Sequence, residues 1–159
     1  MAEQLTGTGD AVVRSATAAD RDELVRLLVA QLREHAIDTP EADVARTVAA
    51  LLRRPRRARF LVAVAGGRPV GVAALSIAWP IEHGGRSAWL EELYVEPSAR
   101  SGGIGTALIR AAFDVARAGG AVAMDLEVDA AHERAAHLYA RVGFRALPRT
   151  RWVRRLTPP

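Results

Sequence analysis

The sequence of 159 residues contains no cysteine and no lysine, and only 5% of its residues are aromatic. The absence of cysteine excludes disulfides, thiolate metal sites and a cysteine nucleophile. The absence of lysine excludes a Walker A phosphate loop, whose signature requires that residue. No apolar run approaches the roughly 18 residues of a membrane-spanning helix. We therefore expect neither a membrane partner nor a covalent cysteine intermediate.

The rest of the composition is typical of one folded domain. Half of the residues are hydrophobic, and the length suits a single domain with a substantial core. Residues 1–10 are small and polar without an apolar segment, which predicts a disordered N-terminal tail rather than a signal peptide. We expect the domain to span residues 11–157 and the protein to be cytoplasmic. The sequence does not reveal the oligomeric state, and a homodimer stays open.

The basic residues of the chain are all arginine, 22 in number, and the formal net charge is +4. The densest basic run lies between Arg53 and Arg59, and clustered arginine is one signature of nucleic-acid binding. A solvated connector between a helix and a strand is the alternative interpretation. The run contains Pro55 and no interleaved aromatic residue. We therefore favour the connector and predict no nucleic-acid partner.

The pattern of apolar and turn-forming residues predicts an α/β (α+β) chain. Thr17 and Asp20 form a capping box that starts one helix, and Thr39 before Pro40 caps a second helix with the proline at its first position. Strands are expected at residues 12–15, 60–65, 70–79, 87–95, 122–128, 144–147 and 151–156. Two further helices are expected, one ending near residue 118 and one at residues 131–142.

A glycine-rich turn follows the strand at residues 87–95. Its glycines lack a Cβ, so the backbone can approach a ligand closely. The apolar residues after them recur at helical spacing, which predicts that a helix begins within the turn. The N–H groups and dipole of a helix start favour a phosphate, and Arg100 would add a fork-shaped donor. The glycine spacing does not fit the dinucleotide fingerprint, and a plain glycine turn is the alternative.

Two motifs in this half of the chain resemble a known family when they are taken together. The first is Arg100-x-x-Gly103-x-Gly105, and the second runs from His132 to Phe144 and ends Leu-Tyr-Ala-Arg-Val-Gly-Phe. Over residues 88–146 they resemble the GCN5-related N-acetyltransferase (GNAT) family. The resemblance implies a single domain with a mixed, mostly antiparallel sheet of about six to seven strands, splayed central strands and four flanking helices.

The same resemblance implies an acetyl-CoA-dependent N-acetyltransferase that acts on a primary amine of a small molecule. Because no cysteine can carry an acyl group, the amine would attack acetyl-CoA directly within a ternary complex. Two alternatives stay open. One is a protein N-terminal or lysine acetyltransferase, since a fold does not name the acceptor. The other is a non-catalytic, CoA-binding regulatory module.

Glu91 and Glu92 are the candidates for the catalytic base, because burial beside aromatic residues can raise the pKa of a carboxyl group to a useful value. Side chains alternate along a strand, so the two acids should point to opposite faces. The pattern does not choose between them. The resemblance implies a bulge in this strand, which can re-aim either acid. An acidic pair here also resembles the diamine acetyltransferase branch, in which such acids hold a cationic amine.

The resemblance also implies residues that bind the pantetheine arm and the pyrophosphate. They are Leu93, Tyr94, Val95, Arg100, Ser101, Gly102, Gly103, Ile104, Gly105, Thr106 and His132, the last in place of an asparagine usual in the family. The phenol of Tyr139, protonated at neutral pH, would be the acid for the leaving thiolate, and a core tyrosine is the alternative.

The histidines do not predict a metal site. His132 and His137 are five residues apart and do not share a helix face. His35 and His83 are expected to be surface residues. We therefore predict no metal.

Overall fold

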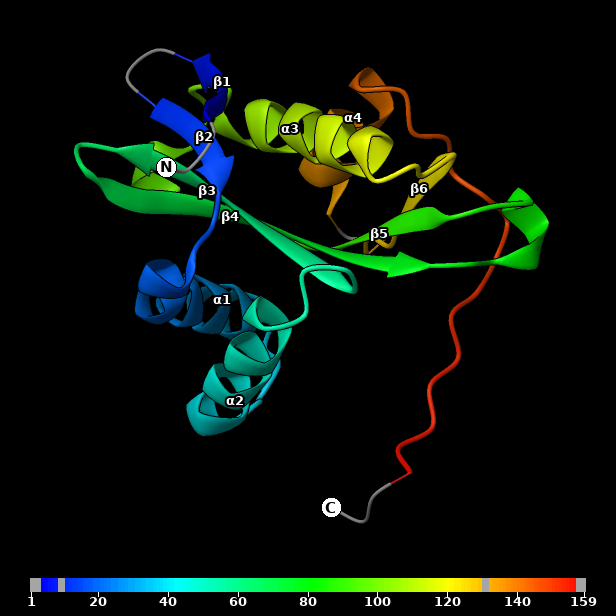
Figure 1. The fold of residues 1–159 in the computed structure, drawn as a ribbon, viewed down its shortest axis with the longest axis horizontal. Helices are drawn as coiled ribbons and strands as arrows, with labels where there is room; N and C mark the ends of the chain where they lie inside the picture. Colours follow the sequence, from blue (N-terminus) through cyan, green and yellow to red (C-terminus); the bar gives the residue numbers. More distant parts are fainter. Residues whose placement is uncertain (1–3, 9–10, 130–131, 157–159) are drawn as a thin grey trace. The chain divides into compact units, whose positions relative to one another are not determined.

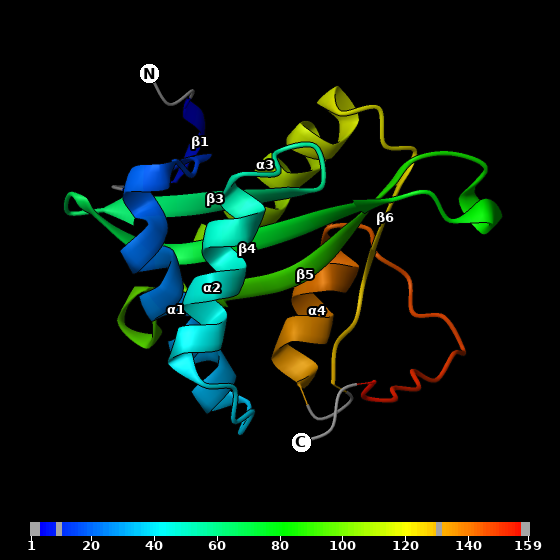
Figure 2. The ribbon, with the colours of Figure 1, turned by 60° about the horizontal axis from the view of Figure 1, so that its bottom comes forward.

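The computed structural model describes residues 4–8, 11–129 and 132–156, and the chain divides into two compact units, residues 1–127 and 128–159. The first unit is a six-stranded sheet with helices α1 and α2 on one face and α3 on the other (Figure 1 and Figure 2). The second unit holds α4. In chain order the elements are β1 (Gln4–Thr8), β2 (Ala11–Ser15), α1 (Arg21–Glu34), α2 (Glu41–Leu52), β3 (Ala58–Ala65), β4 (Arg68–Ala78), β5 (Ser87–Val95), α3 (Ile104–Ala118), β6 (Ala123–Leu126) and α4 (Glu133–Arg141).

The predicted fold class is confirmed by the sheet topology. The strands follow the order β1-β2-β3-β4-β5-β6, with antiparallel neighbours throughout except for the parallel pair β5–β6. Six strands and four α-helices form within the described residues. The strand number is at the lower end of the predicted range.

The parallel pair β5–β6 is short. Residues 87–90 of β5 pair with residues 123–126 of β6, whereas β4 pairs with β5 as far as Val95. Beyond Leu90, the β6 side of β5 therefore has no strand partner among the residues that the structure describes. The end of this pairing agrees with the predicted splay of the central strands.

Apolar cores form on both faces of the sheet. On one face, α1 and α2 pack buried side chains on β3, β4 and β5, among them Leu24, Leu27, Leu28, Val44, Val48, Phe60, Val62, Val72, Ala74 and Tyr94. On the other face, α3 buries Ile104, Leu108 and Ala111, as its predicted apolar side requires. The two cores hold β4 and β5 from both sides, so the residues on these strands have a rigid support.

The starts of the first two helices follow local chemistry. The Thr17 N–H donates a hydrogen bond to Asp20 Oδ2 at 2.7 Å, which confirms the capping box. Asp20 also pairs with Arg14 at 2.7 Å. Pro40 is the N-cap residue of α2, with ψ of 135°, so it lies one position earlier than predicted. Its extended ψ places it before the first helical turn.

The prediction of a disordered N-terminal tail is wrong for residues 4–8. These residues form β1, which pairs antiparallel with β2. The sequence signal for this hairpin is the Gly9-Asp10 pair between two short segments with β-branched residues. Residues 1–3 and 9–10 of the predicted tail lie outside the described residues. So do residue 131, where α4 was predicted to begin, and residue 157, the predicted domain end.

The prediction of two closing strands at residues 144–147 and 151–156 is also wrong. No strand forms at these positions within the described part of the second unit. Trp152, Val153 and Leu156 are exposed there. An isolated two-stranded hairpin is marginal in water unless a third strand or a helix covers its apolar face. Local β-propensity in this segment is therefore not sufficient to form strands.

Candidate active site

Strand β5 is irregular at its acidic pair. Glu92 pairs with Ala74 of β4, but the next pair along the ladder is Leu90 with Leu75. Glu91 is therefore an additional residue without an opposite partner on β4. This irregularity is a β-bulge, which the family resemblance implied. A bulge shifts the alternation of side chains by one residue.

The bulge places both glutamates on the sheet face that α1 and α2 cover. Ala74, the partner of Glu92, belongs to the core beneath these helices. The Glu91 carboxylate accepts a hydrogen bond from the Ser76 hydroxyl, and Ser76 lies two residues beyond Ala74 on the same face of β4. The prediction of opposite faces is therefore wrong, because strict alternation holds only in a strand without a bulge.

The two carboxylates have different surroundings. Glu92 is half-buried and accepts a hydrogen bond from Gln31 Nε2 of α1 at 2.6 Å. Glu91 is exposed. Burial, and next the charge of Glu91, raise the pKa of the Glu92 carboxyl above its ordinary value, while the hydrogen bond from Gln31 acts in the opposite direction. Glu92 can thus hold a proton closer to neutral pH than an ordinary glutamate.

The glycine-rich turn lies between β5 and α3. Ser101 and Gly103 have φ angles of 71° and 82°, in the left-handed region that favours glycine. The hydrogen bond that opens α3 runs from the Ala107 N–H to the Gly103 carbonyl at 3.0 Å. The N–H groups of residues 104–106 precede this bond and have no acceptor within the helix. These N–H groups make the turn a candidate site for an anion.

The other predicted residues of the turn differ in exposure. Gly102 is exposed, Gly105 and Thr106 are half-buried, and Ile104 is a buried core residue. A Cβ at Gly102 would lie 4.0 Å from the Ala99 carbonyl oxygen, which is an ordinary contact. The positive φ at Gly103 makes that glycine the more demanding of the two.

Arg100 is engaged within the protein. Its Nε donates to the Val95 carbonyl at 2.8 Å, and its Nη2 donates to Glu34 at the end of α1 at 2.6 Å. Its guanidinium also lies over the Tyr94 ring, 5.5 Å from the centroid. The hydrogen bond that Arg100 donates to Glu34 is the main cause that raises the pKa of Arg100. Arg100 thus fastens the turn to α1 and β5, a role that the sequence did not indicate.

The three β5 residues assigned to the pantetheine arm lie beyond the last β5–β6 pair. Leu93 and Val95 are half-buried, while Tyr94 is 7% exposed and belongs to the core beneath α1. The Tyr94 ring is therefore a packing group, and only its backbone could contact a ligand. The Val95 carbonyl already accepts a hydrogen bond from Arg100.

Tyr139 and His132 lie in the second unit. His132 is the N-cap residue of α4, and its carbonyl accepts the Ala136 N–H at 3.0 Å. Tyr139 is half-buried and packs edge-to-face on Phe144, with ring centroids 5.8 Å apart. This aromatic contact holds the end of α4 against the residues that follow it.

Comparison with known proteins identifies the family. The model of the acetyltransferase (GNAT) family matches residues 21–144, which include β5, the turn and α4. The chain belongs to the GNAT family of acetyltransferases. It is an N-acetyltransferase, and GNAT enzymes generally use acetyl-CoA.

Three relatives of this GNAT enzyme illustrate the match. The chain is 37% identical to an aminoglycoside N(6')-acetyltransferase type 1 from Klebsiella aerogenes over 120 residues, 72% of this chain and 76% of that protein. It is 36% identical to an uncharacterised N-acetyltransferase from Methanocaldococcus jannaschii over 86 residues, 54% of this chain. The chain covers only 38% of that relative. An integron cassette protein from the mobile metagenome of Cole Harbour Salt Marsh superposes with a TM-score of 0.82, 28% identity and 92% and 91% coverage of the two chains.

A second polar cluster of the GNAT unit lies at the start of β5. His83 Nε2 is 2.9 Å from Asp125 Oδ2, and the buried Ser87 hydroxyl donates to the same oxygen at 2.9 Å. His83 is half-buried, so the prediction of a plain surface histidine is wrong. Its partner Asp125 lies on β6, 42 residues away in the sequence, and no local signal indicated it.

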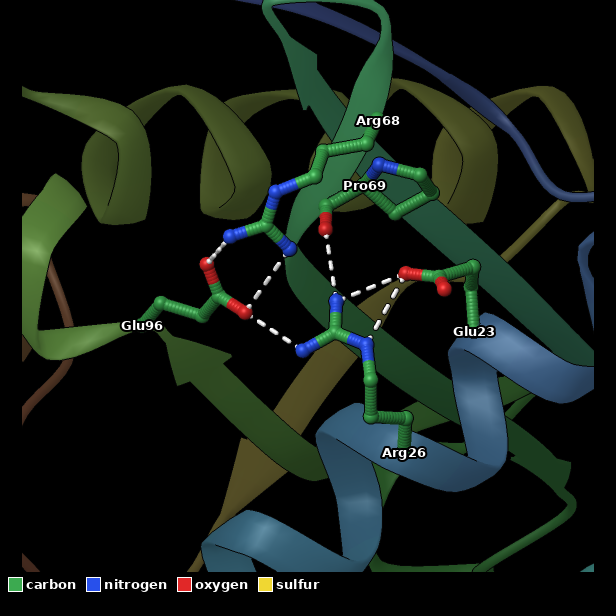
Figure 3. Close-up of polar contacts among 5 residues, drawn as sticks. All are labelled: Glu23, Arg26, Arg68, Pro69 and Glu96. Carbon is green, nitrogen blue, oxygen red and sulfur yellow. Dashed lines mark hydrogen bonds and ion pairs between the residues drawn. The ribbon is translucent and has the colours of Figure 1, made fainter.

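An arginine clamp fastens α1 to the far end of β5. The Glu96 carboxylate accepts hydrogen bonds from Arg68 at 2.6 and 3.1 Å and from Arg26 of α1 (Figure 3). Arg26 also donates to Glu23 at 2.7 Å and to the Pro69 carbonyl at 2.9 Å. Burial acts to raise the pKa of Glu96, but the hydrogen bonds from Arg68 and Arg26 outweigh it and lower that pKa. The clamp holds α1 over the glutamates of β5.

Two features are absent from the described residues. None of the helices there combines the length and the apolar character that a bilayer crossing needs. In the same part of the chain, no three His, Cys, Asp or Glu side chains come together in a way that could hold a metal ion.

Proposed function

We propose that this GNAT enzyme transfers an acetyl group from acetyl-CoA to a primary amine of a small molecule, by direct attack within a ternary complex. One observation carries the proposal. The bulge brings Glu91 and Glu92 to one face of β5, directly after the last residue that pairs with β6. Two carboxylates on one face favour a cationic acceptor. The aminoglycoside acetyltransferase among the relatives supports a small-molecule amine.

The turn before α3 fits the phosphate groups of acetyl-CoA. Gly103 has a positive φ, and the N–H groups of residues 104–106 precede the first helical hydrogen bond. These groups would bind the pyrophosphate, with Ser101 and Gly102 beside them. Backbone groups of Leu93 and Val95, on the β5 edge without a strand partner, would hold the pantetheine arm. When bound, acetyl-CoA supplies the activated acetyl group as a thioester.

Glu92 is the proposed base. Its raised pKa and its half-buried position suit a group that takes a proton from an ammonium near neutral pH. The exposed Glu91, held by Ser76, would contact the same ammonium and orient it. In this assignment, one proton moves from the amine nitrogen to Glu92, directly or through a water, before the nitrogen attacks.

Tyr139 is the proposed acid for the leaving thiolate, and the Leu93 N–H is the proposed donor to the thioester carbonyl. An oxyanion-type donor lowers the barrier because charge develops on that oxygen in the transition state. His132 would take the place of the family's asparagine near the pantetheine arm.

An amine-panel assay that follows free CoA release tests the function. The panel contains aminoglycosides, linear diamines, neutral monoamines, a peptide with a free N-terminus and a lysine-containing peptide. We expect the fastest release with small acceptors that carry more than one amine. If only the peptides support CoA release, the enzyme is instead a protein acetyltransferase. If none of the acceptors supports CoA release, both assignments are contradicted.

A further inference from the structure

The deepest polar side chain beside the glutamates belongs to Gln31 of α1. It is only 8% exposed, and it lies one helical turn after Leu27 and Leu28 on the side of α1 that covers the sheet. The helical pattern of this side requires an apolar residue at position 31. An amide at such a position costs stability unless both of its polar atoms find partners.

Only half of the Gln31 amide is satisfied. Nε2 donates to Glu92 Oε2 at 2.6 Å, across 61 residues of sequence. Oε1 is buried and has no hydrogen-bond partner among the described residues. The one polar contact of this buried amide is therefore the contact with the proposed base. Packing alone would be better served by leucine or methionine at this position.

The hydrogen bond acts on a carboxylate that is otherwise unfavourably placed. From its own strand, Glu92 faces the charge of Glu91. From β4, its neighbours on the same face are Ala74 and Ser76, which carry no charge. From α1, Gln31 donates the N–H that favours the ionised form. Without this donor, burial and the charge of Glu91 would act on Glu92 unopposed.

We propose that Gln31 is the positioning residue of the catalytic base: its amide fixes the orientation of the Glu92 carboxylate and keeps that carboxylate ionised and ready to take a proton. The inference rests on the proposed role of Glu92. The buried, unsatisfied Oε1 is the cost in stability of having this donor inside the core.

The variant Gln31→Met tests the proposal, because methionine has a similar length and removes both polar atoms. With the best amine of the panel, the acidic limb of the kcat/KM profile should move to higher pH by about one unit, since a hydrogen bond to a charged group is worth that much. At a pH on the acidic side of this limb, kcat/KM of the variant should therefore be about tenfold lower than that of the wild type. The thermal midpoint should stay equal to that of the wild type or rise, because the unsatisfied oxygen is gone.

Leu27→Met is the matched control, because it places the same side chain in the same helix without removing a hydrogen bond to Glu92. It should lower the thermal midpoint slightly and leave the pH profile in place. A Gln31→Met variant with a lower midpoint and an unmoved acidic limb would overturn the proposal and make Gln31 a structural residue.

A second measurement keeps the inference separate from the proposed function. NMR titration of labelled glutamate carboxyls in the wild type and in Gln31→Met reports the pKa of Glu92 without any turnover. We expect a higher pKa in the variant. An equal pKa in both proteins overturns the proposal even if the enzyme is active. A wild type that is inactive on every amine, with the pKa difference present, overturns the proposed function and leaves standing only the effect of Gln31 on the pKa of Glu92.

Discussion

Glu92 lies on β5 and Glu96 directly after it, four residues further on, yet the pKa values of their carboxyl groups are shifted in opposite directions. Glu96 accepts hydrogen bonds from two arginines, which lower its pKa. Glu92 receives one neutral amide N–H and faces the like charge of Glu91, and its pKa is raised. Both side chains connect β5 with α1, through Arg26 in one case and Gln31 in the other.

The difference separates a structural carboxylate from a reactive one. A carboxylate that two guanidinium groups hold is stabilised as an anion and is a poor proton acceptor. A half-buried carboxylate beside a like charge takes a proton more readily. We therefore expect substitutions of Glu96 to change stability and substitutions of Glu92 to change turnover.

The largest expected effect is on turnover. Glu92→Gln should lower kcat by about a hundredfold or more, the usual scale of general-base catalysis, and should remove the acidic limb of the pH–rate profile. Glu91→Gln should mainly raise KM for the amine, and Glu96→Gln should turn over near the wild-type rate. Steady-state kinetics of the three variants test this order. Equal losses of turnover in Glu92→Gln and Glu96→Gln would show that the two carboxylates do not differ in their roles.

Removing the Tyr139 hydroxyl tests whether catalysis needs an acid besides the two glutamates of β5. Tyr139→Phe keeps the ring that packs on Phe144 and removes only the proposed acid. We expect turnover to fall by about a hundredfold, with acetyl-CoA affinity nearly intact by calorimetry. If turnover is unchanged, Tyr139 is a packing residue and another group protonates the thiolate.

Substitutions in the turn before α3 should change the affinity for CoA rather than the rate of the chemical step. Gly103→Val strains a backbone with φ of 82° and places a branched side chain where the pyrophosphate would bind. Calorimetry should show CoA affinity reduced at least tenfold in a variant that remains folded by circular dichroism. Gly102→Ala, at a position with room for a Cβ, is the milder control. Unchanged affinity in folded Gly103→Val would falsify the pyrophosphate assignment.

The smallest effect concerns stability and its pH dependence. Glu96→Gln should lower the free energy of unfolding by about 1–2 kcal/mol at neutral pH. Because the pKa of Glu96 is lowered by folding, this contribution is present above the ordinary glutamate pKa and is lost as the pH falls below it. Urea denaturation at several pH values checks this, by the difference between wild type and variant.

Glu92 should show the opposite sign in the same experiment. Its pKa is raised by folding, so its favourable contribution is present at low pH and is lost as the pH rises through the folded-state pKa. Glu92→Gln should therefore be as stable as the wild type or more stable at neutral pH. A parallel pH dependence of the two variants would contradict the comparison.

The features that the sequence predicted correctly depend on neighbours along the chain. The capping box of Thr17 and Asp20 joins residues three apart, and the glycine turn and the start of α3 lie within seven residues. The GNAT motifs are equally local. Such signals are readable because the groups that interact are close in the chain, whatever the rest of the fold does.

The features that the sequence missed depend on partners far away. Arg100 was predicted to bind phosphate, and its contact with Glu34, 66 residues away, was not predicted. No sequence pattern indicated a role for Gln31. The contact between His83 and Asp125 spans 42 residues. In each case the residue type permitted several partners, and only the packing of α1, β5 and β6 selected one.

The sequence by itself determined that an acidic strand ends at a glycine turn, that a helix begins there, and that the family is GNAT. It did not determine on which faces the two acids lie. That depends on the register between β4 and β5, because the bulge at Glu91 exists only relative to the strand opposite. The tertiary structure therefore decided that Glu91 and Glu92 share one face, and that α1 brings Gln31 to one of them and Arg26 to Glu96.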